Sequence, residues 1–201
     1  MSPQRVFLTG FMGSGKSTLG PILANVLGYR FADLDARVAE AAGAPVARLF
    51  AERGEAAFRV LEADALRATG REKGLVVATG GGALAREPSL AWALTCGTVV
   101  YLRASPDALA LRLQRSRTVR PLLLDAGGAR LSEDAFRARL DALLDARRPF
   151  YTQAHVTVDV GTGPVGPTVD AVVRALRQTW ARLEGRGTMS EKNRVPRPSG
   201  S

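Results

Sequence analysis

The residues best suited to chemistry stand near the start of the chain, where positions 10–18 read GFMGSGKST. The spacing G-x-x-x-x-G-K-S, after an apolar run and before a helical pattern, is typical of a phosphate-binding loop. Its glycines let backbone N–H groups turn toward a phosphate at the N-terminal end of the next helix. Lys16 would reach the β- and γ-phosphates and Ser17 would ligate Mg²⁺. The pattern favours a nucleotide site over a chance glycine turn, with predicted contacts at Gly13, Ser14, Gly15, Lys16, Ser17 and Thr18.

Two carboxylates, Asp33 and Asp35, follow the second apolar run. Open α/β sheets bind ligands at the carboxyl ends of their strands, and alternate strand residues project to one side. Asp33 is a candidate for holding Mg²⁺ through its water molecules. Asp35 is a candidate for accepting a hydrogen bond, or the proton, from a substrate hydroxyl. The alternative for Asp35 is a structural one, as the N-cap of the following helix.

Two other segments could complete a site. Residues 55–62 are predicted to be helical, and Arg59 and Glu62 within them could form an ordinary ion pair between adjacent turns. Gly80, Gly81 and Gly82 end a buried strand-like run, and glycines there leave backbone amides open to the close approach of a ligand. Neither segment alone identifies a function.

Arginines gather in and after residues 116–130, a stretch without clear periodicity that predicts a long functional loop. Arg120 lies within the stretch, and Arg147 lies near the end of the helix predicted after it. Guanidinium groups suit phosphate and carboxylate oxygens. An arginine on a mobile loop suits phosphoryl transfer, because loop closure delivers a cation and excludes water.

The elements that must position these residues alternate along the chain between apolar runs and helical patterns, which predicts a parallel sheet with helices on both faces. We predict strands at 5–9, 29–33, 75–79, 98–102 and 155–160, and helices at 16–27, 34–43, 46–53, 55–70, 87–95, 105–115, 132–148 and 165–183. The 201 residues suit one domain, which we place at residues 1–184 with a lid at about 112–130. Residues 185–201 are rich in Gly, Ser, Pro and charge, so a disordered basic tail is expected.

The composition, with 46% hydrophobic and 23% charged residues, is that of an ordinary globular protein. No apolar run approaches the roughly 20 residues of a membrane span, and the N-terminus lacks a signal pattern, so we expect a cytoplasmic protein without a membrane partner. Cys96, the only cysteine, excludes an internal disulfide and is expected to be buried and inert. The net charge of +9 fits nucleic acid or an anionic substrate. Because no basic stripe alternates with aromatic residues, we expect no nucleic-acid partner.

Together these residues resemble the shikimate kinase family. The segments that carry the resemblance, to about residue 183, are the loop at 10–18, Asp33-Leu-Asp35, Phe58-Arg59-x-x-Glu62, Gly80–Gly82, Arg120-Pro-Leu-Leu and Arg147-x-x-x-Tyr151. The resemblance implies transfer of the γ-phosphoryl group of ATP to the 3-hydroxyl of shikimate, in aromatic amino acid (chorismate) biosynthesis. It also implies a three-layer α/β/α P-loop NTPase fold with a five-stranded parallel sheet of order 2-3-1-4-5, a lid and a substrate-binding helical segment.

The resemblance further assigns roles. Lys16, Asp35 and Arg120 would be catalytic: Asp35 would hold the acceptor hydroxyls, and the two cations would neutralise the transferring group. Arg59 and Arg147 would bind the substrate carboxylate, Glu62 would orient Arg59, and Gly81 would offer a backbone amide. Ser17, and Asp33 through water, would hold one Mg²⁺ in each subunit of a monomeric enzyme. The apolar wall would come from Val46, Phe50 and Phe58, although core packing explains each equally well.

The chain departs from the family pattern after its last strand, where residues 159–166 lack the arginine that commonly helps to cover adenine. Arg115 is the better candidate for that contact and Arg112 the weaker. The lid also looks longer than in many members. The only histidine, His155, is expected to be structural.

Two other functions stay open. Another small-molecule P-loop kinase, such as one acting on gluconate, would share the loop and sheet. A nucleotide-binding relative without catalysis would be expected to have lost Lys16, Asp35 or Arg120, and all three are present.

Overall fold

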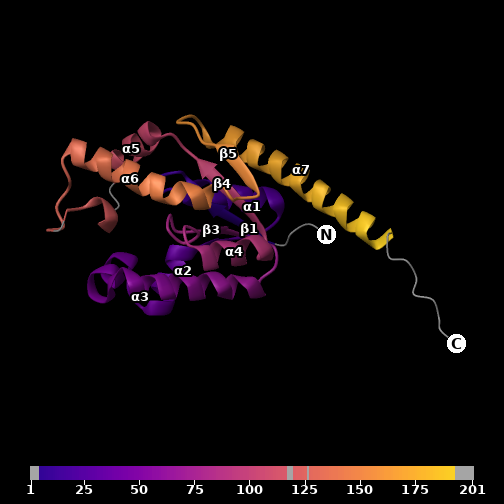
Figure 1. Cartoon of the computed structure of the whole chain (residues 1–201), viewed down its shortest axis with the longest axis horizontal. Helices are drawn as coiled ribbons and strands as arrows, with labels where there is room; N and C mark the ends of the chain where they lie inside the picture. Colours follow the sequence, from indigo (N-terminus) through magenta and orange to yellow (C-terminus); the bar gives the residue numbers. More distant parts are fainter. Residues whose placement is uncertain (1–4, 117–119, 126, 193–201) are drawn as a thin grey trace.

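The computed structural model describes residues 5–116, 120–125 and 127–192. Its centre is a sheet of five parallel strands in the order β2-β3-β1-β4-β5, which confirms the predicted architecture (Figure 1). The strands are β1 (Arg5–Thr9), β2 (Arg30–Asp33), β3 (Leu75–Ala78), β4 (Thr98–Arg103) and β5 (Val156–Asp159). Because parallel strands need crossover connections, helices separate them and cover the faces of the sheet.

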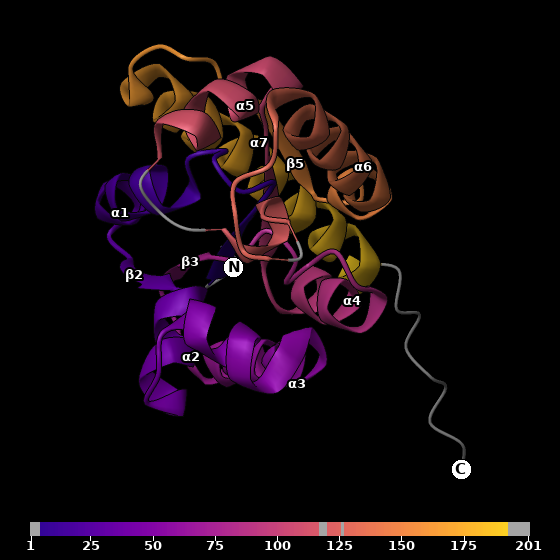
Figure 2. The same ribbon diagram turned by 90° about the vertical axis from the view of Figure 1, so that its left-hand side faces the viewer.

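The helices are α1 (Lys16–Leu27), α2 (Leu34–Ala42), α3 (Val46–Ala68), α4 (Glu87–Cys96), α5 (Pro106–Arg115), α6 (Glu133–Tyr151) and α7 (Val165–Lys192). Two short 3₁₀ turns, η1 (Thr69–Arg71) and η2 (Pro121–Leu123), complete the described elements. Helices α1 and α7 pack on one face of the sheet, and α3 and α4 pack on the other. Figure 2 shows α2 and α3 at one end of the molecule, with α5 and α6 at the other end.

The buried core explains why the central strands read as continuous apolar runs. Leu75 to Ala78 of β3 are all buried, as are Val6, Phe7 and Leu8 of β1. The edge strands differ. Strands β2 and β5 have only four residues each, and β5 alternates buried and exposed side chains. Both faces of the central strands are therefore covered, whereas the edges carry polar groups.

Several helix ends differ from those predicted, and α6, for example, ends at Tyr151 rather than at residue 148. The predicted break between helices at 46–53 and 55–70 is confirmed: α3 is interrupted at Gly54, where the φ of 76° and the ψ of 171° are not helical. Helix α7 continues to Lys192, so the expected disordered tail is wrong over residues 185–192, while 193–201 lie outside the described residues. The composition of residues 185–192 does not predict a helix. An existing helix can still extend through such a segment, because adding a residue to it requires no new nucleation.

The expected lid falls partly within regular structure. Its first residues, 112–115, form the end of α5, and its described remainder contains η2 and an antiparallel bridge between Leu124 and Arg130. Residues 117–119 and 126 lie outside the described chain. The position of the loop, between α5 and α6, places Arg120 beside the carboxyl ends of the strands.

Two remaining side chains have structural surroundings. The Nδ1 atom of His155 accepts a hydrogen bond from the backbone N–H of Val99 at 3.0 Å, in keeping with the structural role expected of it. Cys96 is only partly buried, not fully buried as expected. Within the residues described, none of the helices combines the length and the apolar character needed to cross a bilayer.

Candidate active site

The phosphate-binding loop connects β1 to α1 and depends on glycine backbone angles. Gly10, Gly13 and Gly15 have φ values of 138°, 82° and 96°, which side-chain-bearing residues rarely adopt. Lys16 begins α1 and is buried, and its Nζ atom donates to the carbonyl oxygens of Gly10 at 2.8 Å and Phe11 at 2.9 Å. The loop is thus already folded around the ammonium group that the sequence assigns to phosphate binding.

Burial lowers the pKa of Lys16 to about 8, although the carboxylate of Asp35 opposes this shift. Bound phosphates would stabilise the charged ammonium and raise its pKa, so nucleotide and proton should bind cooperatively. We expect the affinity for Mg²⁺-ATP to fall as the pH rises through about 8, with net proton uptake on binding at pH 8.5 and almost none at pH 6.5. Calorimetry in buffers of different ionisation enthalpy measures this uptake. Lys16→Arg, which does not titrate in this range, is the control, and equal uptake by both proteins would contradict the prediction.

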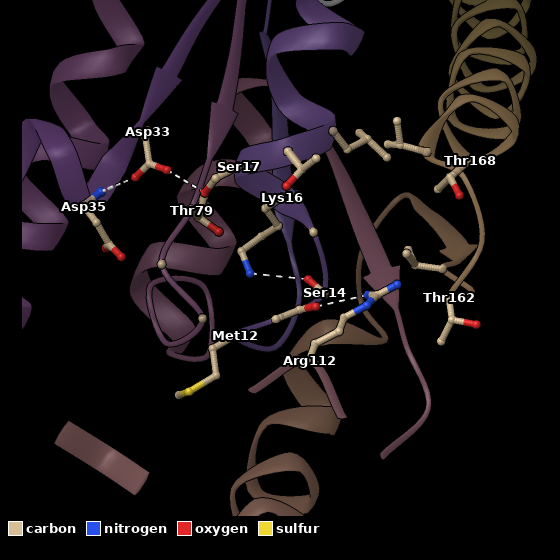
Figure 3. Close-up of a pocket in the computed structure, with 18 of the residues that line it drawn as sticks. Met12, Ser14, Lys16, Ser17, Asp33, Asp35, Thr79, Arg112, Thr162 and Thr168 are labelled. Atoms are coloured by element: carbon tan, nitrogen blue, oxygen red, sulfur yellow. Dashed lines mark hydrogen bonds between the residues drawn. The ribbon is translucent and has the colours of Figure 1, made fainter. Parts of the chain in front are cut away.

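Ser17 and Asp33 lie together at the end of β2. The Oγ atom of Ser17 donates to Oδ2 of Asp33 at 2.7 Å (Figure 3). The other oxygen, Oδ1, accepts from the backbone N–H of Asp35 at 3.0 Å and of Ala36 at 3.4 Å. Asp33 is therefore the N-cap of α2, and the alternative that gave this role to Asp35 is wrong.

The donor set at Ser17 and Asp33 fits a magnesium ion. A hydroxyl and a carboxylate oxygen are hard ligands of the kind that Mg²⁺ prefers. Residues 5–116, 120–125 and 127–192 contain no cluster of three or more His, Cys, Asp or Glu side chains able to hold a metal. A hydroxyl and one carboxylate suit a cation that keeps several waters and is held partly by nucleotide phosphates.

A cavity of about 440 Å³ opens over the phosphate-binding loop. Residues 12–19 form one wall, and the loop after β5 forms another with Thr162 and Gly163, followed by Val165 and Thr168 of α7 (Figure 3). Asp35 and Arg120 line its inner end. The shape provides space for a nucleotide whose phosphates lie on the loop and whose base lies toward α7.

Of the two candidates for the adenine contact, Arg112 is the one that lines this cavity. Its Nη1 atom donates to the carbonyl of Gly13 at 3.1 Å, and its Nη2 atom donates to the carbonyl of Gly161. Arg115 is exposed and is not among the lining residues, so the geometry favours Arg112, although the adenine contact itself stays a prediction. The sequence carries no signal for this choice, because both arginines follow a leucine at helical spacing, and only the structure shows that Leu109 is buried and Leu111 exposed.

A second cavity of about 300 Å³ adjoins the first. Met12, Asp35, Gly80, Gly81 and Arg120 line both cavities, so a molecule in one lies next to a molecule in the other. The second cavity is otherwise lined by Val46, Ala47, Phe50, Phe58, Arg59, Glu62, Gly82, Leu122 and Arg147. The structure therefore brings the predicted acceptor residues together at the carboxyl edge of the sheet. The role of Met12 in both walls was missed, because its side chain has no distinctive chemistry.

Asp35 stands where the two cavities meet and is partly buried in the first turn of α2. Burial raises the pKa of its carboxyl group, and the nearby charge of Asp33 raises it further. The cations Lys16, Arg120 and Arg59 oppose the rise. A carboxylate with a raised pKa is a stronger proton acceptor, which suits a group that receives a hydroxyl proton.

Arg59 forms the ion pair predicted for it and also lines the second cavity, where its substrate contact stays a prediction. Its Nη1 atom lies 2.7 Å from Oε2 of Glu62, and its Nη2 atom lies 2.9 Å from Oε1 of Glu55, so the helical ion pair exists. The same guanidinium lies over the rings of Phe50 and Phe58 and lines the second cavity. The two glutamates fix its orientation, in agreement with the role expected of Glu62. Burial raises the pKa of Glu62, although Arg59 opposes that shift.

Arg147 is the less satisfied of the two acceptor arginines. It is 8% exposed, and its guanidinium carbon lies 5.3 Å from the centre of the Phe11 ring. Its Nη1 atom is buried and finds no hydrogen-bond partner among the described residues, and the same holds for Nε of Arg120. An unpartnered buried N–H on a cation is costly unless a ligand completes it. These atoms therefore point to an anionic ligand.

The three glycines after β3 make room for these charged side chains. A methyl group on Gly80 would stand 2.5 Å from Oε1 of Glu62 and 2.8 Å from Oδ1 of Asp35. On Gly81 it would stand 3.3 Å from Nη1 of Arg147. On Gly82 it would stand 2.7 Å from Nη2 of Arg59. The glycines were predicted for close approach of a ligand, and the structure adds that the site's own side chains require them.

We therefore expect Gly82→Ala to raise the Michaelis constant for the acceptor about tenfold, because the new methyl group displaces the guanidinium of Arg59 and a charged hydrogen bond is worth about 1.5–3 kcal/mol. The constant for ATP should stay unchanged. Steady-state kinetics with each substrate varied in turn measure both. Gly166→Ala in α7 has open space around the added methyl group and is the matched control. Equal kinetics for the two variants would argue against the crowding.

The sheet order, the phosphate-binding loop and the adjoining acceptor cavity define a P-loop kinase of small molecules. The family model described as shikimate kinase matches residues 12–177. The chain belongs to the shikimate kinase family.

Individual relatives agree with this assignment. A shikimate kinase from Salinibacter ruber is 49% identical over 174 residues, which cover 87% of this chain and 85% of the relative. One from Chlorobium luteolum is 46% identical over 173 residues, covering 86% and 85%. The structure of a shikimate kinase from Acinetobacter baumannii in complex with shikimate superimposes with a TM-score of 0.78 at 32% identity, covering 87% of this chain and 93% of that one.

A gluconokinase from Sinorhizobium meliloti is also similar, with a TM-score of 0.60 at 22% identity, covering 92% of this chain and 98% of that one. At this identity the likeness shows the fold alone. The alternative acceptor considered from the sequence therefore has no support beyond the shared fold.

Proposed function

We propose that the protein transfers the γ-phosphoryl group of ATP to the 3-hydroxyl of shikimate, giving shikimate 3-phosphate and ADP, in aromatic amino acid (chorismate) biosynthesis. The observation that carries the proposal is the pair of adjoining cavities, one on the phosphate-binding loop and one lined by Arg59 and Arg147, with Asp35 and Arg120 shared between them. The family assignment supports the same acceptor.

On the nucleotide side, backbone amides from Gly13 to Ser17 would bind the phosphates, with Thr18 beside them at the start of α1. Lys16 would exchange its bonds to the loop carbonyls for phosphate oxygens. A Mg²⁺ ion would be held by Ser17 directly and by Asp33 through water, and when bound it neutralises charge on the β- and γ-phosphates. Arg112 would lie beside the nucleotide, bonded to Gly13 and to the loop after β5.

On the acceptor side, Arg147 and Arg59 would bind the carboxylate, which supplies the anion that the free Nη1 atom of Arg147 requires. Phe50 and Phe58 would contact the apolar side of the ring. The amide of Gly81, which is only partly buried, would contact the substrate. Asp35 would accept hydrogen bonds from the ring hydroxyls and hold the 3-hydroxyl toward the nucleotide.

Phosphoryl transfer then needs a positioned hydroxyl and compensation of charge on the moving group. Asp35 accepts the proton of the attacking hydroxyl, a role favoured by its raised pKa. Lys16 and Arg120 face the transferring group from the loop and from the lid.

We also propose that the protein is a cytoplasmic monomer that binds neither nucleic acid nor membrane. The large apolar side chains exposed on the described surface are few, at Ile22, Val26, Val60, Leu111 and Leu183, and lie on several different helices. Scattered exposed residues of this kind are normal on a monomer.

The test is ADP release from Mg²⁺-ATP with shikimate, with gluconate and with no acceptor. Release that depends on shikimate and fails with gluconate supports the proposal. Lys16→Ala, which removes the phosphate-binding ammonium, is the control for a contaminating kinase. Release that shikimate does not stimulate, in a protein shown by calorimetry to bind ATP, would overturn the proposed acceptor.

A further inference from the structure

We propose that Tyr151 is a positioning residue for the acceptor: its hydroxyl holds the carbonyl group of Gly81 and so fixes the glycine turn that forms one wall of the acceptor cavity. The inference rests on the proposed function. Tyr151 is the last residue of α6, and it does not line either cavity itself. It would act on the substrate through the turn, and its hydroxyl also interacts with the side chain of Arg147.

The contact is made in a buried setting. Tyr151 is 1% exposed, and its hydroxyl donates to the carbonyl oxygen of Gly81. Its ring is stacked on the ring of Tyr101 in β4, with centroids 5.0 Å apart and an angle of 26° between the planes. Burial also raises the pKa of Tyr151 to about 12, so the hydroxyl keeps its proton and stays a donor at physiological pH. Stacking on Tyr101 of β4 thus fixes the ring of Tyr151, and the hydroxyl on that ring fixes the glycine turn.

The turn needs this external bond. The carbonyl of Gly80 accepts from the N–H of Ala83 at 3.1 Å, and that of Gly82 accepts from the N–H of Ala85 at 3.2 Å. The carbonyl of Gly81 between them is bonded to Tyr151, across 70 positions of sequence. Three glycines in succession have more conformational freedom than any other tripeptide, so a long-range bond at the middle one restricts them most.

Helix α6 also contributes Arg147 to the lining of the acceptor cavity. Arg147 precedes Tyr151 by four residues and therefore lies on the same face of the helix. A methyl group on Gly81 would stand only 3.3 Å from Nη1 of Arg147, so the turn and the carboxylate-binding arginine pack against each other. Helix α6 consequently positions both Arg147 and the backbone amides of the glycine turn beside it. A displaced Gly81 would change the space in which the substrate carboxylate fits.

The test uses Tyr151→Phe, which keeps the ring and its stacking and removes the hydroxyl. One net hydrogen bond is worth about 0.5–1.5 kcal/mol, so we expect the Michaelis constant for shikimate to rise about three- to tenfold. The constant for ATP should stay within twofold. Tyr101→Phe is the matched control, because it removes a hydroxyl from the partner ring, whose described bonds do not reach the glycine turn, and both constants should stay near the wild type.

A purely structural role of the Tyr151 hydroxyl would change other measured quantities. It would lower the melting temperature of Tyr151→Phe and raise both of its Michaelis constants together, and that pattern would overturn the proposal. So would an unchanged shikimate constant in Tyr151→Phe. If this variant folds poorly, p-aminophenylalanine at position 151 restores an N–H donor on the same ring and should restore the shikimate constant. Failure to restore it in a folded protein would count against the proposal.

Amide hydrogen exchange separates this inference from the proposed function. Removing the hydroxyl should speed exchange in residues 80–83 in the absence of any substrate, while exchange in the phosphate-binding loop stays the same. A wild-type protein that fails to phosphorylate shikimate would overturn the function, whereas exchange rates that are equal in wild type and Tyr151→Phe would overturn the positioning role.

Discussion

Asp35→Asn is expected to bind Mg²⁺-ATP nearly as tightly as the wild type and to transfer the phosphoryl group at least a hundredfold more slowly. The substitution keeps the shape of the side chain and removes its ability to take up a proton, and general base catalysis contributes about 10²–10⁴ in rate. It also removes the carboxylate that raises the pKa of Lys16, so the comparison belongs at a pH well below the wild-type value of about 8. Single-turnover kinetics and calorimetric titration with ATP measure the two quantities.

The matched control is Asp141→Asn, which makes the same chemical change at an exposed position in the middle of α6. It should leave both rate and affinity unchanged. A transfer rate within tenfold of the wild type in Asp35→Asn would remove the carboxylate from the proton transfer and leave it a binding role alone.

Arg147→Lys is expected to raise the Michaelis constant for shikimate about 10- to 100-fold and to leave the constant for ATP within twofold. An ammonium group cannot reproduce two parallel N–H donors, and a hydrogen bond to a charged group is worth about 1.5–3 kcal/mol. The effect should be large here because Nη1 of Arg147 has no other partner in the described structure, so the substrate supplies its hydrogen bond. Arg59→Lys should act in the same direction, since Glu55 and Glu62 hold its guanidinium in place for the same ligand.

Arg148→Lys provides the control, because the next residue along α6 is exposed and pairs with Asp145 on the surface. Its kinetics should match the wild type. If Arg147→Lys bound shikimate normally in a direct titration, the carboxylate would have to lie elsewhere in the cavity.

Much of the fold could be predicted from the sequence because its strongest signals are local. Buried parallel strands are continuous apolar runs, and those runs located all five strands to within a residue or two. The strand order came from the family resemblance, since periodicity carries no information about which strands pair. Helix ends were less certain: no local signal in residues 185–192 showed that α7 would continue through them.

Within the site, prediction was most reliable where a motif contains the residues that its backbone conformation requires. The loop at 10–18 contains the glycines that its turn requires, so the placement of Lys16 and Ser17 followed from the sequence. Choices between neighbours were harder. Asp33 and Asp35 both stand at a strand end, and only the hydrogen bonds of α2 show which one caps the helix. The roles assigned to individual residues stay predictions until the variants are measured.

Contacts that span the chain were beyond local reasoning. The bond from Tyr151 to Gly81 and the crowding of Gly80 by Asp35 and Glu62 join elements far apart in the sequence. A single sequence records the residue types of such a contact but not their proximity. The triple glycine was therefore assigned to the ligand, whereas the nearest neighbours of Gly80 and Gly82 are charged groups of the protein itself.

The short edges of the sheet have a consequence for the protein at high concentration. An exposed strand edge is a template for pairing with another chain, and a long, flat, apolar edge favours aggregation. Strands β2 and β5 offer four residues each, and they carry exposed Arg30 at the start of one and exposed Asp159, paired with Arg103, at the end of the other. Intermolecular strand addition would have to bury these charges for few backbone bonds, so the architecture that seats the two cavities also protects the protein from fibrous self-association.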